Sequence, residues 1–233
     1  MSDIEEMNPR SPEMSPGTLH IFPSYRRSEQ IADSWVHAIG ITGGLVAVIA
    51  LLTAAGQKQS LLLFLGVGLY GFGLLAMLSC SALYNLAKPS ARKENLRRLD
   101  RAAIFTMIAG SYTPFLLNRI GGGWGWGMLA FVWSVATFGA GLALAAPRRF
   151  ERAQLATYLL LGWSIVVASE PLFAQVAPAA ILLLIVGGLF YSLGVPIHLW
   201  RRLSYHNAIW HGLVLIAAGC HYAAVLVGVV LAS

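Results

Sequence analysis

Charged residues divide this chain into long uncharged runs. Each run has at least 17 residues without Asp, Glu, Lys or Arg. A helix needs roughly 17–25 residues to cross the hydrocarbon core of a membrane, and no run shows the short alternating segments of a β-barrel. We therefore predict an all-α fold, a bundle of seven transmembrane helices. The predicted spans lie in 38–57, 59–87, 102–118, 120–147, 153–169, 171–200 and 203–233.

The composition supports this prediction. Hydrophobic residues make up 57% of the chain and charged residues 11%, whereas a soluble domain has about 25% charged residues. The mean hydropathy is +0.67. These values exclude an ordinary soluble enzyme and a disordered chain.

Lys and Arg are distributed unevenly around the predicted spans. Fourteen of the 16 lie in the N-terminal segment or in the links after the second, fourth and sixth spans. The other side of the membrane has only Lys58 and Arg119. Because positive charge stays cytoplasmic, we predict a cytoplasmic N-terminus and an external C-terminus. The net charge of +6 is then a topology signal, and we expect no nucleic-acid partner.

Residues 1–33 differ in character from the rest of the chain. They contain four prolines and mixed charges, a composition typical of a mobile tail. We predict a cytoplasmic tail at 1–33, followed by a seven-helix domain at 34–233. Cys80 and Cys220 fall within predicted spans, where they are expected to be small apolar core residues.

Several polar residues are predicted to lie at one depth, near the cytoplasmic ends of their spans. Ser81 and Asn85 are four residues apart and share a face of the second span. Asn207 and His211 form the same pairing at the start of the seventh span, and Asp100 opens the third. Polar groups inside a membrane are costly, so they are functional candidates. Together these five residues predict a buried polar pocket.

Three of these residues also have a purely structural interpretation. Asp100 could cap the third span or pair with Arg97 and Arg98. Ser81 could bond the carbonyl one turn back, and His211 could be a satisfied core histidine.

Other histidines have weaker functional signals. His37 and His198 are expected at the membrane interface, with their polar tips among the headgroups. His206 is expected to be solvated. His221 lies ten residues beyond His211, about 15 Å further along a helix, so the two cannot share a ligand.

Six segments form a recognisable pattern: 32–40 (ADSWVHAIG), 81–84 (SALY), 98–100 (RLD), 108–115 (IAGSYTPF), 187–194 (GGLFYSLG) and 207–211 (NAIWH). With them the chain resembles the hemolysin III family of the progestin and adiponectin receptor superfamily, from about Glu29 onward. The resemblance implies seven spans with the N-terminus inside. It also implies an integral protein of a bacterial inner membrane.

In the better-understood relatives, three histidines hold a zinc ion near the cytoplasmic face. An aspartate and a serine complete that site, for which a zinc-dependent lipid amide hydrolysis is proposed. By resemblance, Ser81 and Asp100 are the catalytic candidates and His211 is a metal ligand. The other two histidine positions fall on Asn85 and Asn207.

This departure from the family pattern weakens the expected zinc site. Zinc prefers imidazole, thiolate or carboxylate donors over a neutral amide oxygen. His37 or His206 could complete the ligand set. His206 is five residues from His211, so the start of the seventh span would have to unwind for both to bind one ion.

Three functions are consistent with these residues, and membrane lipids are the expected partners of all three. The first is a non-catalytic protein of lipid sensing or membrane homeostasis, with a polar pocket that includes His37, Asn85 and Asn207. The second is a metal-dependent hydrolase of lipid amides or esters, with Asp100 as base and Ser81 supporting the oxyanion. The third is a cytolytic pore, disfavoured because Glu170 is the main ionisable group in the outer halves of the spans.

Overall fold

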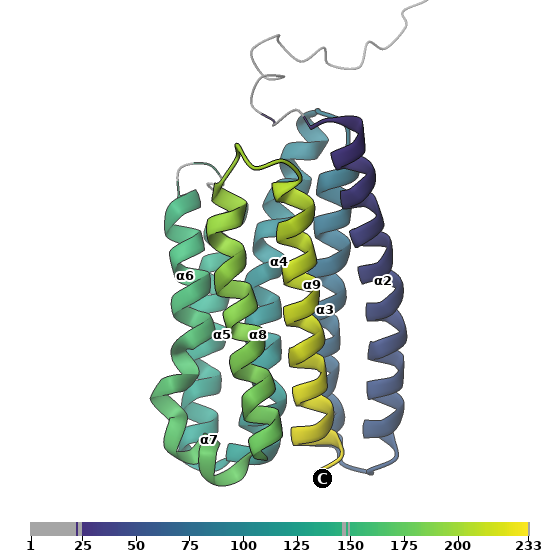
Figure 1. Cartoon of the computed structure of the whole chain (residues 1–233). Helices are drawn as coiled ribbons and strands as arrows, with labels where there is room; N and C mark the ends of the chain where they lie inside the picture. The colour runs from purple at the N-terminus through teal and green to yellow at the C-terminus, as the bar shows by residue number, and fades with distance from the viewer. Residues whose placement is uncertain (1–21, 23–24, 146–147, 149, 233) are drawn as a thin grey trace, which may run out of the picture.

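The computed structural model describes residues 22, 25–145, 148 and 150–232. Every regular element in these ranges is helical, and the long helices run side by side (Figure 1). The predicted all-α class is therefore confirmed. In chain order the elements are α2 (Arg27–Gly56), α3 (Leu61–Leu86), α4 (Ala91–Phe115), η1 (Leu116–Ile120), α5 (Gly122–Ala145), α6 (Glu151–Trp163), η2 (Ser164–Ala168), α7 (Ser169–Gln175), α8 (Pro178–Leu199), α9 (His206–Val225) and η3 (Leu226–Val230).

Six helical stretches of the described chain are long and apolar enough to cross a membrane. They are α2, α3, α5, α8 and the continuous stretches Glu151–Gln175 and His206–Val230. The other predicted span, 102–118, lies in α4 and η1. Because α4 joins a strongly charged first half to an apolar second half, it does not count among the six. Six of the seven predicted spans thus correspond to helical stretches that could cross a membrane.

Local sequence signals explain where several helices begin. The Ser60 hydroxyl accepts a hydrogen bond from the Leu63 amide (3.3 Å) at the start of α3. Ser90 does the same for Lys93 (3.1 Å) at the start of α4. Serine is a favoured N-cap because its side chain satisfies a free amide of the first turn. Pro178 opens α8, where its missing N–H has no cost.

The first helix begins earlier than the predicted domain boundary. Residues 1–21 and 23–24 lie outside the described residues, but α2 already starts at Arg27. The segment 27–33 is therefore helical. It brings Asp33, the last residue of the predicted tail, into the bundle, where its exposed fraction is 6%.

Four helix ends lie together at one end of the bundle. The starts of α2, α4 and α9 and the end of α3 lie at one end of the bundle, and the C-terminus lies at the other (Figure 1). α2 packs against both α3 and α9, and α3 packs against α4. Polar residues from the ends of four helices can therefore meet at this end of the bundle.

The α3–α4 contact depends on a close approach at Gly73. A Cβ atom there would lie 3.0 Å from both the Cα of Met107 and the carbonyl oxygen of Thr106. Both are backbone atoms, so they cannot move aside by a change of rotamer. Gly68, on the same helix, has open space at its Cβ position.

We expect Gly73→Ala to push α3 and α4 apart and to destabilise the protein by about 1–3 kcal/mol, since overpacking a close contact has this cost. The midpoint of thermal unfolding in detergent should fall by about 2–12 °C. Gly68→Ala is the matched control and should leave the midpoint unchanged or slightly raised. If both variants lowered the midpoint equally, the close approach of α3 and α4 at Gly73 would not be what determines the stability of the protein.

Candidate metal centre

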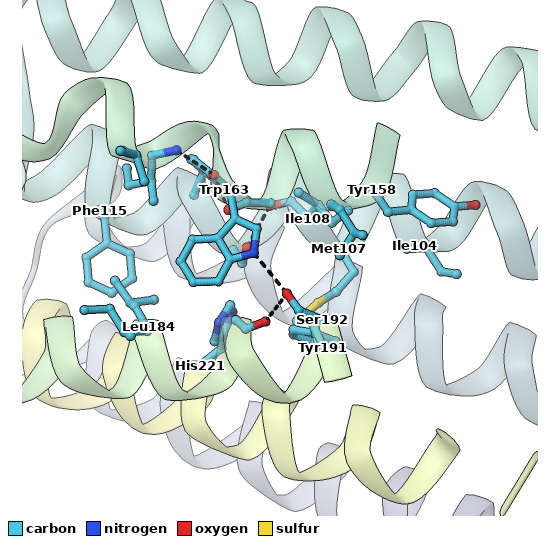
Figure 2. A pocket seen from close by; sticks show the side chains of 18 of the residues that line it. Ile104, Met107, Ile108, Phe115, Tyr158, Trp163, Leu184, Tyr191, Ser192 and His221 are labelled. Atoms are coloured by element: carbon cyan, nitrogen blue, oxygen red, sulfur yellow. Dashed lines mark hydrogen bonds between the residues drawn. The ribbon is translucent and has the colours of Figure 1, made fainter. Parts of the chain in front are cut away.

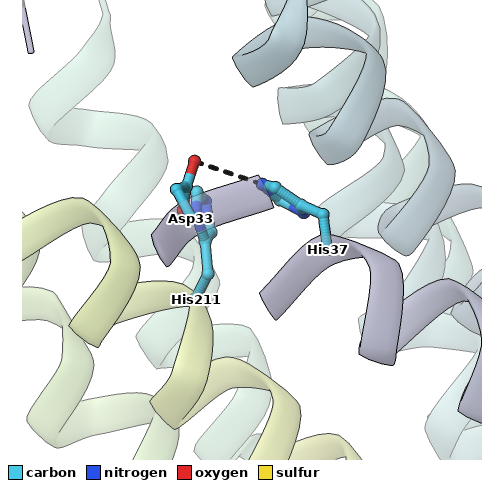
Figure 3. Close-up of side chains that lie close together, drawn as sticks. All are labelled: Asp33, His37 and His211. Atoms are coloured by element: carbon cyan, nitrogen blue, oxygen red, sulfur yellow. Dashed lines mark hydrogen bonds and ion pairs between the residues drawn. The ribbon is translucent and has the colours of Figure 1, made fainter. Parts of the chain in front are cut away.

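Asp33 and His37 lie one turn apart on α2 and share the face that meets α9 (Figure 3). Both are buried, with exposed fractions of 6% and 5%. The distance from His37 Nε2 to Asp33 Oδ2 is 3.5 Å, which makes them an ion pair when His37 is protonated. A carboxylate is costly to bury alone, so the surrounding partners decide what this pair can do.

The first turn of α2 is fixed to the start of α9. One carboxylate oxygen of Glu29 accepts a hydrogen bond from the Tyr205 amide (3.0 Å), directly before α9. The other oxygen accepts from the Arg26 amide (2.9 Å). The bond from Tyr205 joins the two helix starts and brings the face with Asp33 opposite α9, whereas the bond from Arg26 stays within the start of α2.

α9 provides His211 and Asn207, one turn apart on the same face. His211 Nδ1 lies 2.6 Å from Asp33 Oδ1, a short charge-assisted contact. The Asn207 amide donates to Asp33 Oδ2 at 3.0 Å. The rings of His37 and His211 lie 4.5 Å apart. Both oxygens of Asp33 are thus held in position by α9.

α3 adds the pair Ser81 and Asn85. The Ser81 hydroxyl lies 3.4 Å from His211 Nε2. The Asn85 amide donates to the Ser81 carbonyl (2.9 Å), and its oxygen accepts from Asn207 (3.2 Å). Asn85 therefore links α3 to α9, and Asn207 links α9 to both α2 and α3, so the amides are used to position neighbouring groups.

A cavity of about 80 Å³ opens beside this cluster and is lined by Ser81, Asp100, His37 and His211. Asp100 comes from α4 and is close enough to Ser81 and His211 to interact with both. The sequence left open a pairing of Asp100 with Arg97 and Arg98. Arg97 bonds Glu94 at 2.7 Å and Glu151 at 2.9 Å, and Arg98 lies 4.0 Å from Glu94. Both arginines thus have glutamate partners, and Asp100 lies in the wall of the cavity.

Asp33, His37 and His211 fit the donor set of a divalent metal ion. One ligand atom from each lies within 4.8 Å of the other two. Around a tetrahedral zinc ion with bonds of about 2.0–2.1 Å, the ligand atoms are about 3.3 Å apart. The distance from Asp33 Oδ2 to His37 Nε2, 3.5 Å, is close to this value. His211 Nδ1 contacts the other carboxylate oxygen, Oδ1, at 2.6 Å, so binding of one ion through a single oxygen of Asp33 would require the carboxylate or the His211 ring to shift.

A second, larger cavity adjoins the polar one (Figure 2). Its volume is about 330 Å³, and side chains of α4, α6, α7 and α8 form most of its apolar wall. Met77, Ile104, Tyr191 and Trp210 line both cavities. The polar cluster therefore lies at one end of a space suited to a long apolar group.

Comparison with known proteins assigns the family. The model of the haemolysin-III related family matches residues 25–222. This chain belongs to the haemolysin III family. A hemolysin-3 homolog of Bacillus subtilis is 32% identical over 85% of this chain and 93% of its own length. Hemolysin-3 of Bacillus cereus is 35% identical over 80% of this chain and 85% of its own.

The relatives extend to animals, as expected for the progestin and adiponectin receptor superfamily. The human monocyte to macrophage differentiation factor is 31% identical over 67% of each chain. No solved structure matches this haemolysin III protein. With six apolar membrane-length helices and this family membership, it is an integral membrane protein.

The residues selected from the sequence of this haemolysin III protein lie together in space. Ser81, Asn85, Asn207 and His211 form one connected network, and Asp100 and His37 face the same cavity. Their catalytic, binding and metal roles stay predictions. Asp33 was missed as a member of the site, although its spacing from His37 repeats the spacing of Asn207 and His211 and was the available signal.

Two histidines differ from their expected surroundings. His37 was expected among the headgroups, but its exposed fraction is 5% because it packs against His211. His206 was expected to be solvated, but it is buried beneath Tyr25, with ring centres 5.7 Å apart. Burial raises the pKa of Tyr25 to about 12, so this phenol stays protonated over His206. His206 is not part of the metal cluster.

Proposed function

We propose that this protein is a metal-dependent hydrolase of a lipid amide or ester. The observation that carries the proposal is the cluster of Asp33, His37 and His211, whose ligand atoms lie within 4.8 Å of one another. His37 and His211 also line the cavity that Ser81 and Asp100 line. A metal cluster beside a hydroxyl and a second carboxylate is the arrangement that metal-assisted hydrolysis requires.

Zinc is the metal that this donor set favours. Two imidazoles and one carboxylate leave a fourth position open, as in catalytic zinc sites. Asn207 donates to Asp33 Oδ2, which fixes the orientation of the carboxylate. The family histidines replaced by Asn85 and Asn207 are then not needed as ligands, because α2 provides Asp33 and His37 in their place.

The adjoining apolar cavity supports a lipid as substrate. A long acyl chain fits its apolar wall, and the shared residues Met77, Ile104, Tyr191 and Trp210 lead from it to the polar cluster. A lipid carbonyl would then lie between the metal cluster and Asp100. This placement makes membrane lipids the proposed partners.

The side chains divide the chemistry among them. A zinc ion at this site would activate a water molecule and polarise the lipid carbonyl. Asp100 accepts the proton of the attacking water and returns it to the departing amine or alcohol. Ser81 orients its hydroxyl toward the carbonyl oxygen, where negative charge develops. The acyl carbon exchanges its bond to the leaving group for a bond to the water oxygen, and the products are a fatty acid and an amine or alcohol.

The proposed topology has this chemistry on one side of the membrane. We propose seven spans, with the polar cluster and the N-terminus cytoplasmic in a bacterial inner membrane. The basic links predicted from the sequence support this orientation. The arrangement of the helices supports an odd number of spans, because the start of α2 and the C-terminus lie at opposite ends of the bundle (Figure 1).

A second candidate function is non-catalytic lipid sensing in membrane homeostasis. The observation in its favour is that Asp33, Asn207 and Asn85 already satisfy one another across α2, α9 and α3. Such a network can hold a bundle in one state without a metal ion. A cytolytic pore has less support, since the opposite end of the bundle has buried apolar side chains such as Phe115, Leu116 and Val229.

The hydrolase is tested with the purified full chain in zinc-containing detergent micelles. We expect release of fatty acid from a long-chain N-acyl amide or from the matching ester, and loss of this release in His211→Ala. His206→Ala removes a buried histidine outside the cluster and is the matched control. Equal release by wild type and His211→Ala would contradict the proposal. No stoichiometric zinc and no release of fatty acid from either lipid would favour the sensing function.

A further inference from the structure

Tyr191 occupies a special position on α8, because it lines both the apolar and the polar cavity. Its hydroxyl oxygen is buried and has no hydrogen-bond partner in the described part of the chain. Figure 2 shows it at the wall of the apolar cavity, next to Ser192. It is thus a hydrogen-bonding group at the junction of two cavities.

Most tyrosines around the apolar cavity are already satisfied by the protein. The Tyr112 hydroxyl lies 2.8 Å from the Leu161 carbonyl oxygen, and Tyr158 donates to the Arg101 carbonyl at 2.9 Å. Tyr70 also has a buried hydroxyl without a partner, but it lines neither cavity. A buried hydroxyl without a partner is costly and requires a reason. For Tyr191, the reason can be a ligand, because this residue lines two cavities.

The ring of Tyr191 is held in place by α9. The His221 ring packs against it edge to face, with ring centres 5.5 Å apart and planes at 80°. His221 fits there because residue 187 is glycine, since a Cβ at Gly187 would collide with the His221 ring. The hydroxyl is therefore fixed in position before a ligand binds, which lowers the entropic cost of a new hydrogen bond.

We infer that Tyr191 is a positioning residue for a lipid carbonyl. Its hydroxyl donates a hydrogen bond to the carbonyl oxygen of a lipid whose acyl chain fills the apolar cavity. The carbonyl is thereby held at the entrance of the polar cavity, beside Ser81 and His211. This inference rests on the proposed function for its substrate class, but the binding step itself requires neither metal nor hydrolysis.

The test compares two non-hydrolysable probes that differ only in the carbonyl. One is a long-chain methyl ketone with bromine atoms on its chain, and the other is the brominated hydrocarbon of the same length. Trp163 and Trp210 line the apolar cavity, so bromine quenching of tryptophan fluorescence in the purified full chain reports binding of either probe. We expect Tyr191→Phe to weaken ketone binding about three- to tenfold, the effect of one lost hydrogen bond, with hydrocarbon binding unchanged.

Tyr222→Phe is the matched control, because Tyr222 is on α9 and lines neither cavity. It should bind both probes as the wild type does. Unchanged ketone binding in Tyr191→Phe, or an equal loss for both probes, would overturn the inference.

The zinc content of the same preparations separates this inference from the proposed function. Tyr191→Phe should keep the zinc content of the wild type, because Tyr191 is not a ligand. If no preparation holds zinc but Tyr191→Phe still weakens only ketone binding, then the hydrolase proposal fails and the inference about Tyr191 stands.

Discussion

Asp33→Asn is expected to abolish stoichiometric zinc binding. The substitution keeps the shape of the side chain but removes its negative charge, so one of the three proposed ligands becomes a neutral amide. Changes in groups that only orient metal ligands lower metal affinity about 10–100-fold. Loss of a ligand should therefore cost more than about a hundredfold. Elemental analysis after dialysis should find zinc in the wild type and almost none in Asp33→Asn.

A matched control for this variant is Glu29→Gln. Glu29 is one turn before Asp33 on α2, and its carboxylate bonds backbone amides of Tyr205 and Arg26. It also loses one negative charge, but it contributes no atom to the cluster. The amide of Glu29→Gln keeps one oxygen that can accept from the Tyr205 amide, so this variant should hold α2 against α9 and retain zinc. If Asp33→Asn retained as much zinc as Glu29→Gln, the proposed ligand set would be wrong.

Asp100→Asn is expected to abolish hydrolysis and to leave the zinc in place. Asp100 lines the polar cavity but is not among the three clustered ligands. As the proposed general base, it should account for about a 10²–10⁴-fold rate enhancement. We expect kcat for the N-acyl amide to fall by this factor with little change in KM. Initial rates and zinc content measured on one preparation test both parts of the expectation.

The comparison of the two variants distinguishes a ligand from a base. Asp33→Asn should lose metal and activity together, whereas Asp100→Asn should lose activity alone. Loss of zinc in Asp100→Asn would make Asp100 a fourth ligand, and activity that survives the change would exclude it as the base.

The membrane helices could be predicted from the sequence because charge is so costly in a bilayer that its absence marks each span. The same cost allowed the polar residues to be assigned a depth. Ser81, Asn85, Asp100, Asn207 and His211 were predicted to lie at one level, and they lie around one cluster. α4 was harder to assign, since its charged first half continues directly into its apolar second half.

The neighbours of each helix could not be predicted from the sequence. Depth is encoded in the position of a residue along its own span, but the contact of α2 with α9 depends on packing between helices far apart in the chain. For this reason, Asp33 was assigned to the tail and His37 to the membrane interface. The bond from Glu29 to the Tyr205 amide, which fixes this contact, joins residues 176 positions apart.

X-ray absorption at the zinc edge of the purified wild type would show directly whether Asp33, His37 and His211 hold a zinc ion. The ligand set predicts two imidazoles with oxygen donors at about 2.0–2.2 Å. The imidazole contribution should fall to one in His37→Ala, and His206→Ala should keep both. Binding of zinc by Asp33, His37 and His211 would be contradicted by a zinc ion with three imidazoles, by a spectrum unchanged in His37→Ala, or by the absence of bound zinc.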